Sequence, residues 1–133
     1  LLFWMVCPIR NANRIYYRRE AMTEFIQIQW SCGSLEEARK VSRYLVQERY
    51  VACANVIPWL ESIYMWDNQL DTSQESKVYL KTRSENFDAI KEVILQNTSY
   101  ELPEILSFSI TDGHQEYLNW IQESTVSFAK ATV

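Results

Sequence analysis

The sequence predicts an α+β domain whose elements follow the order strand, helix, strand, strand, helix, strand, with one further helix at the end. Three observations support this prediction. Apolar and polar residues alternate in three short segments, at residues 25–30, 76–82 and 105–110. Apolar residues recur at helical spacing after residues 34 and 84. A long run with almost no charge, at residues 51–66, predicts the remaining strand.

The first predicted unit is a strand, a turn and a helix. In the strand, apolar side chains occupy one face and glutamines the other, as in a half-buried strand. Gly33 breaks this strand, and Ser34 followed by Glu37 forms the capping box that is typical of a helix start. The helix is expected to bury one stripe of apolar side chains, formed by Leu35, Ala38, Val41, Leu45 and Val46.

The next two strands are predicted to form an antiparallel hairpin. Pro58 cannot donate a ladder hydrogen bond, so it implies an edge, a bend or a bulge in the long strand. Residues 67–73 are polar and are predicted to form the turn. A strand as long as residues 51–66 is hard to cover within one small domain. The sequence therefore predicts an extended arm that another subunit covers.

The second half repeats the pattern of a helix followed by a strand. Ser84 is predicted to cap a helix whose buried stripe contains Phe87, Ile90 and Ile94. Residues 100–104 form an ordered connection, because the residue before a proline prefers an extended backbone. The last strand is expected to alternate Leu106, Phe108 and Ile110 against two serines, and the closing helix to place Tyr117, Leu118 and Ile121 on one side.

This order of elements is that of the ferredoxin-like, or split βαβ, fold. Its helices cover one face of the sheet. The opposite face is expected to be wet or to pack around the axis of an oligomer, and it is predicted to contain Gln27, Gln29, Tyr79, Lys81, Ser107 and Ser109.

Composition and charge limit the functional classes. The chain has 133 residues and a net charge of -4, and the residues after 22 are the acidic part. Nucleic-acid binding, which needs clustered Lys and Arg, is therefore disfavoured. No apolar run approaches the roughly 20 residues that span a bilayer, so no membrane partner is expected. Three cysteines without a CxxC motif favour a reducing compartment, and we expect a cytoplasmic protein.

The predicted domain occupies residues 23–125. Residues 1–22 are interpreted as an N-terminal extension without a fold of its own, since the arginines follow the apolar stretch rather than precede it as in a secretory signal. The alternative is an extra helix that docks on the domain. Residues 126–133 are interpreted as a C-terminal tail.

Several motifs together resemble the CutA family of divalent-cation tolerance proteins. They cover about residues 25–124 in order, and they read ACANVIP (52–58), SIYMW (62–66), KT (81–82), YELPEI (100–105) and YLNWI (117–121). The resemblance implies a ferredoxin-like fold, a homotrimer assembled through the long hairpins, and a link to tolerance of copper and other divalent metals. Some members are described as binding copper through a cysteine and a histidine pair.

This chain departs from that copper-binding pattern. The corresponding positions look like Trp30, Asn97 and Thr98, none of which is a good copper ligand. Cys32 lies two residues from the expected place and would substitute only with a rearranged turn. The single histidine, His114, excludes a histidine-based zinc site within one chain.

Candidate binding residues come from the hairpin and the connection at residues 100–104. Cys53 is either a metal ligand in a pocket between subunits or a small buried side chain. Glu104 either holds a ligand or a cation, with Glu101 and Tyr100, or has a structural role. In that role it satisfies buried backbone donors or pairs with Lys81 across an interface. Tyr64 and Trp66 either stack a ligand or anchor an interface.

The leading hypothesis is a non-enzymatic, CutA-like homotrimer that binds a small ligand or a metal ion between subunits. The predicted pocket residues are Cys53, Tyr64, Trp66, Lys81, Tyr100 and Glu104, and the metal-ligand candidates are Cys32, Cys53 and Glu104. The alternatives are a regulatory effector-binding module of the PII type and an enzyme that uses Lys81, Tyr100 and Glu104. The chain has two glycines, and no GxGxxG, P-loop or GxSxG motif occurs.

Overall fold

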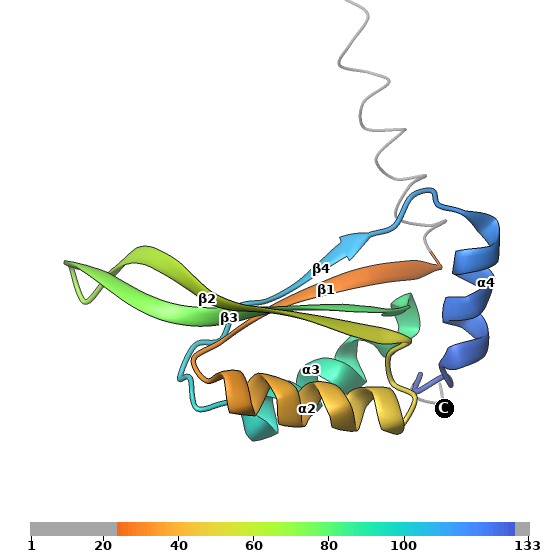
Figure 1. Ribbon diagram of the computed structural model, residues 1–133, viewed down its shortest axis with the longest axis horizontal. Helices are drawn as coiled ribbons and strands as arrows, with labels where there is room; N and C mark the ends of the chain where they lie inside the picture. The colour runs from red at the N-terminus through yellow and green to blue at the C-terminus, as the bar shows by residue number, and fades with distance from the viewer. Residues whose placement is uncertain (1–23, 130–133) are drawn as a thin grey trace, which may run out of the picture.

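A four-stranded antiparallel sheet with two helices on one face organises the computed structural model, which describes residues 24–129 (Figure 1). The strand order is β2-β3-β1-β4, as expected for the split βαβ arrangement, so the predicted fold class is confirmed. The elements are β1 (Phe25–Cys32), α2 (Leu35–Gln47), β2 (Cys53–Trp66), β3 (Gln69–Arg83), a 3-10 turn (Ser84–Asn86), α3 (Phe87–Asn97), β4 (Ile105–Ser109) and α4 (Gln115–Ser124).

The core lies between the sheet and helices α2 and α3. The predicted helical stripes face it, except that Val46 is 39% exposed, and so do the apolar positions of β1 and β3. The largest fully buried side chains of this layer are Ile28, Trp30, Leu45, Leu80, Ile90 and Ile94. A second, smaller cluster, in which Phe25 packs with Ile121, attaches α4 to the end of the sheet.

Helix α2 is capped at both ends by local hydrogen bonds. Ser34 Oγ accepts from the Glu37 backbone N–H at 3.3 Å, as the capping box predicts. The Glu37 carboxylate instead accepts from the backbone N–H and the hydroxyl of Ser99, at 3.0 and 3.1 Å, and so anchors the loop before β4. Arg49, in the left-handed region at φ 62°, donates from its backbone N–H to the Val46 carbonyl and ends the helix.

The hairpin turn is shorter than predicted. Asp67 and Asn68 alone form it, with φ angles of 49° and 62°, as a type I′ turn requires. The prediction of a turn over residues 67–73 was wrong, because the polar residues after Asn68 continue β3 and pair with β2. Pro58 lies at a bulge, where the register shifts between Ile57 and Leu60, which confirms the predicted irregularity. The resulting ribbon projects beyond the helices (Figure 1).

The edge strand β4 presents the opposite face from the one predicted. Ser107 pairs with Ile28 and Phe108 with Gln27, so Ser107 shares the helix side of the sheet and Phe108 the open side. Leu106 and Phe108 are consequently 45% and 49% exposed. The error has a physical reason: alternation shows which residues share a face, but pairing with β1 decides which face meets the helices.

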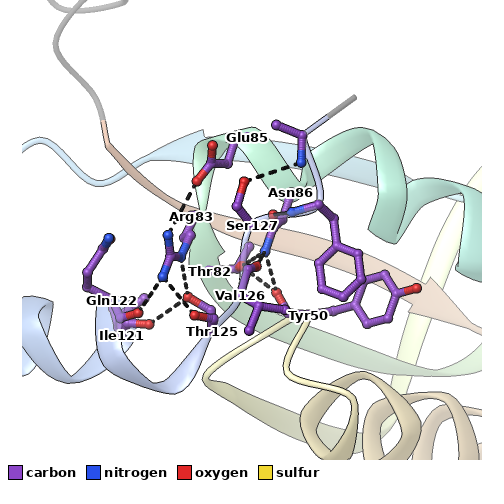
Figure 2. Close-up of polar contacts among 12 residues, drawn as sticks. Tyr50, Thr82, Arg83, Glu85, Asn86, Ile121, Gln122, Thr125, Val126 and Ser127 are labelled. Atoms are coloured by element: carbon purple, nitrogen blue, oxygen red, sulfur yellow. Dashed lines mark hydrogen bonds and ion pairs between the residues drawn. The ribbon is translucent and has the colours of Figure 1, made fainter. Parts of the chain in front are cut away.

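The segment after α4 folds back onto the domain (Figure 2). The Arg83 guanidinium donates to the carbonyls of Gln122 and Thr125, both at 2.7 Å. Asn86 is fully buried and holds this segment to β3, and the Phe128 ring stacks on the Tyr50 ring with centroids 3.8 Å apart. Part of the predicted C-terminal tail, residues 126–129, therefore packs on the domain. The predicted extension at residues 1–22 lies outside the described residues.

Candidate functional site

A cavity of about 570 Å³ lies between the β2-β3 ribbon and the loop before β4. Its walls come from the ribbon and from the loop before β4, which are far apart in sequence. Four of the six predicted pocket residues line it, namely Tyr64, Trp66, Tyr100 and Glu104. Its size is within the range of small-molecule sites, and we call it the hairpin cleft.

Glu104 is the most strongly bound carboxylate of the hairpin cleft. Lys77 Nζ donates to its Oε2 at 2.5 Å, Gln29 Nε2 donates to its Oε1 at 2.9 Å, and the Ser31 hydroxyl also donates to Oε2. Burial acts to raise the pKa of Glu104, but these three hydrogen bonds outweigh it and lower the pKa. Within the chain Glu104 therefore pairs with Lys77, and the predicted pairing with Lys81 across an interface stays a prediction.

Tyr100 closes the cleft from the loop side. Its hydroxyl donates to Glu75 Oε1 at 3.0 Å, while the Ser62 hydroxyl donates to Glu75 Oε2 at 2.7 Å. Burial and the hydrogen bond to Glu75 raise the pKa of Tyr100 to about 12. Tyr100 therefore stays a neutral hydrogen-bond donor at physiological pH.

The two predicted aromatic residues of the ribbon remain partly open to solvent. Tyr64 is 37% exposed and Trp66 is 44% exposed. The Tyr64 hydroxyl donates to Ser73 Oγ at 3.3 Å, across the hairpin. With Tyr100 they supply three aromatic surfaces to a cleft that also contains the exposed carboxylates of Asp71 and Glu101.

The other two predicted pocket residues lie outside the hairpin cleft. Cys53 begins β2 and Lys81 is its direct partner on β3, near α4. Lys81 Nζ lies 3.8 Å from Cys53 Sγ and donates to Asn55 Oδ1 at 2.7 Å. The Tyr117 hydroxyl lies 3.7 Å from the same sulfur. The six predicted residues thus form two groups, one in the cleft and one beside α4.

The candidate metal ligands do not converge within one subunit. Cys32 is fully buried and donates to the Ser34 carbonyl at 3.1 Å, and burial raises the pKa of its thiol to about 11, which disfavours the thiolate that a metal needs. The Glu104 carboxylate forms an ion pair with Lys77, and Cys53 lies beside Lys81, so a positively charged side chain occupies the place next to each candidate ligand. Across residues 24–129, no group of three or more His, Cys, Asp or Glu could hold a metal ion.

Trp30, Asn97 and Thr98, which stand where copper-binding members of the family have their ligands, have structural roles in this chain. Trp30 is fully buried in the core. Asn97 donates from Nδ2 to the Val93 carbonyl at 2.7 Å, within α3. The Thr98 hydroxyl accepts from the Tyr100 backbone N–H at 3.2 Å, and exposed His114 precedes α4. A copper site of the described cysteine-histidine kind therefore does not fit these residues.

Sequence reasoning missed two residues that organise the cleft. Neither Lys77 nor Glu75 was singled out. The alternation of β3 could have indicated them, because Glu75 and Lys77 are at odd positions, as Lys81 is. Side chains at these positions project from one face of the strand, and this face meets the loop before β4. Their partners, however, follow only from the folded loop.

The chain is similar to the proteins of one known family. The family model of the CutA1 divalent ion tolerance protein matches residues 26–124. The divalent-cation tolerance protein CutA of Thermus thermophilus is 39% identical over 92 residues, which are 69% of this chain and 89% of the relative. The chloroplastic protein CutA of Arabidopsis thaliana is 33% identical over 68% of this chain and 50% of its own length.

A solved structure shows the same fold. The divalent cation tolerance protein from Thermus thermophilus superposes with a TM-score of 0.74 and 35% identity, and the match covers 77% of this chain and 99% of the other. Within residues 24–129, no helix has the length and apolar character needed to cross a bilayer. The match of the family model over most of the chain, together with these relatives, shows that the protein belongs to the CutA1 divalent ion tolerance protein family.

Proposed function

We propose that the protein acts in divalent-cation tolerance as a non-enzymatic homotrimer that binds a small ligand or a metal ion in clefts between subunits. The single observation that supports this proposal best is the uncovered β2-β3 ribbon. Large apolar side chains are exposed on it, including Trp59, Ile63, Met65 and Leu70, each between 63% and 72% exposed. Contiguous exposed apolar surface of this kind marks an interaction site.

The edge of the sheet supports the same proposal. β2 is an edge strand of 14 residues, so one row of its backbone groups has no partner strand in the described part of the chain. Long exposed edges invite pairing with another chain. The open face adds Leu106 and Phe108, which the corrected register of β4 places there. A second and third copy would remove these surfaces from water.

Residues of this ribbon form one wall of the hairpin cleft, so assembly would turn it into a site between subunits. Its exposed carboxylates, Asp71 and Glu101, are oxygen donors of the type that hard cations prefer. Because no metal-binding group forms within residues 24–129 of one chain, a cation would need donors from more than one subunit. Copper, zinc and nickel are the cations to test.

Calorimetric titration of the full chain with each metal tests the cation proposal. The doubly substituted variant Asp71→Asn, Glu101→Gln should bind less tightly, while Asp88→Asn on exposed α3 is the matched control. Deletion of the gene should raise metal sensitivity. Absence of binding in all three titrations, with unchanged sensitivity after deletion, would contradict the proposed function.

The second candidate is a regulatory module that binds an effector, and the aromatic walls of the cleft favour it. Tyr64, Trp66 and Tyr100 can stack a flat ring in a cavity of about 570 Å³. A thermal-shift screen with nucleotides and metabolites separates the two candidates. A shift by such a ligand, lost in Trp66→Ala, supports the effector, and a shift by metal alone supports the cation.

A further inference from the structure

We propose that the hairpin cleft binds an aliphatic polyamine, a flexible chain that carries two or more separated ammonium groups. The assignment rests on the proposed function, because it names the class of small ligand that the cleft between subunits takes. Three properties of the cleft support a polyamine: the balance of its charges, the distribution of its carboxylates and its aromatic walls.

The charges of the cleft favour a cationic ligand. Four carboxylates and one ammonium group line it, so its formal balance is -3. The ammonium group, Lys77 Nζ, is already bound to Glu104. In the part of the chain that the structure describes, no ion pair includes Asp71, Glu75 or Glu101. A polycation would supply the missing positive charge, whereas the phosphates of a nucleotide would be repelled.

The unpaired carboxylates are distributed along the cleft and do not meet at one point. Asp71 lies on β3 in the ribbon, and Glu101 lies in the loop before β4. Within residues 24–129, no group of three or more His, Cys, Asp or Glu could hold a metal ion. A hard metal ion needs several oxygen donors around one centre. The ammonium groups of a polyamine are instead separated by methylene groups, and a cavity of about 570 Å³ has room for such a chain.

Aromatic rings lie beside these carboxylates. Asp71 is the direct Cα partner of Tyr64, so the two side chains are neighbours on one face of the ribbon. Trp66 follows two residues later on the same face, and Tyr100 closes the cleft from the loop. The rings of Tyr64 and Trp66 remain partly exposed in the single chain. The face of such a ring attracts an ammonium group and also packs against methylene groups, so the walls match both parts of a polyamine.

Calorimetric titration of the full chain with spermidine, which has three ammonium groups, tests the proposal. The matched ligands are 1,4-diaminobutane and butylamine, which share one carbon chain and differ by a single ammonium group. Spermidine should bind at one site per chain, and each ammonium group removed should weaken binding about fivefold. Added salt should weaken the binding of spermidine more than that of butylamine, because salt screens the attraction of each charge.

Substitutions locate the binding in the cleft. Asp71→Asn removes one charge and Trp66→Ala removes one ring, and each should weaken spermidine binding about fivefold. Trp66→Phe keeps a ring face and should restore most of the affinity that Trp66→Ala loses. Asp88→Asn, on exposed α3, removes the same charge outside the cleft, and this matched control should bind spermidine as the parent does.

Failure of this proposal and failure of the proposed function give different results. If spermidine does not bind, or binds no more tightly than butylamine, the polyamine assignment is wrong. The proposed function then still stands if copper, zinc, nickel or a metabolite binds and Asp71→Asn or Trp66→Ala weakens that binding. An equal loss of spermidine affinity in Asp88→Asn and Asp71→Asn would show general attraction to an acidic surface and would also overturn the assignment. If no amine, metal or metabolite binds, the assignment and the proposed ligand-binding function both fail.

Discussion

The ring of Tyr100 occupies the space that a side chain on Gly33 would need. A Cβ built on Gly33 would lie 2.7 Å from Tyr100 Cε1 and 2.8 Å from the Tyr100 hydroxyl oxygen. Gly33 joins β1 to the cap of α2, and Tyr100 belongs to the loop before β4. The close approach therefore joins two segments that together form one wall of the hairpin cleft.

Gly33→Ala is expected to displace Tyr100 and to break its hydrogen bond to Glu75. The free energy of unfolding should fall by about 1 kcal/mol, the net worth of one such bond. Gly33 has no positive φ, so alanine itself strains nothing. In a Tyr100→Ala background, Gly33→Ala should instead raise the free energy of unfolding. The new methyl group then displaces nothing, and alanine only reduces the entropy of the unfolded chain.

Denaturant unfolding measures the change in unfolding free energy that Gly33→Ala causes in each background. The protein concentration is kept fixed, since concentration shifts the stability of an oligomer. Gly113→Ala is the matched control, because its new Cβ would meet only the flexible Leu118 side chain, at 3.3 Å. If Gly33→Ala lowered the free energy of unfolding equally in both backgrounds, the loss would not come from the displacement of Tyr100.

Glu104 is expected to make the fold acid-sensitive. Its pKa is lowered below the ordinary 4.5 despite burial, since Lys77, Ser31 and Gln29 stabilise the carboxylate. A lowered folded-state pKa means that the contribution to stability is present above pH 4.5 and is lost as pH falls through the lower value. Glu104→Gln should lower the free energy of unfolding by about 1–2 kcal/mol at neutral pH. On acidification, the free energy of unfolding of this variant should fall less than that of the parent.

Unfolding free energies of Glu104→Gln and the parent between pH 7 and pH 3 test this. Glu101→Gln supplies the control, since that carboxylate is exposed in the same loop and makes none of the hydrogen bonds described above. Parallel stability curves for Glu104→Gln and the parent would rule out the ion pair as a source of acid sensitivity.

Tyr100 is expected to make the fold sensitive to alkali. Because its folded-state pKa is raised from 10.0 to about 12, the neutral phenol stabilises the fold below pH 10.0, and this contribution is lost as pH rises toward 12. Burial also raises the pKa of Tyr50 and of Tyr117, so several tyrosines of the parent should ionise late in an ultraviolet titration, and Tyr100→Phe should remove one tyrosine from the late phase near pH 12. An unchanged amplitude of the late phase in Tyr100→Phe would show that Tyr100 does not contribute to it.

Asn86 is expected to be essential for the attachment of the C-terminal segment (Figure 2). Its Nδ2 donates to the carbonyls of Tyr50 and Val126, and its Oδ1 accepts from the Phe128 backbone N–H at 2.8 Å. Asn86→Asp removes both donors and buries a charge, so we expect a loss of about 2–4 kcal/mol. Thermal unfolding measures this loss of stability, and Asn119→Asp, at an exposed position, is the control. Similar losses in both variants would contradict the role of Asn86 in holding the C-terminal segment.

Much of the fold follows from local pattern. The strand at residues 25–30, the helical stripes and the bulge at Pro58 were predicted because burial and backbone chemistry act on neighbouring residues. The length of β3 was missed, because polar residues in a solvated ribbon resemble a loop. The face of β4 was missed, because only pairing with β1 sets it.

The site was predictable as a region but not as a set of contacts. Tyr64, Trp66, Tyr100 and Glu104 line one cleft of the single chain, and their role in a pocket between subunits stays a prediction. The pairing of Glu104 with Lys77 within the chain was not predicted. Lys77 and Lys81 lie on the same face of β3, and only the folded loop brings one of them close to Glu104. No sequence periodicity could choose between them.

Sedimentation equilibrium of the full chain at micromolar concentration tests the central claim, that copies of the chain cover one another's exposed ribbons. We expect a mass of three chains, and Trp59→Asp together with Leu70→Asp should shift it toward the single chain, because both side chains are 72% exposed on the ribbon. A stable, fully folded single chain at that concentration would contradict the claim and remove the proposed clefts between subunits.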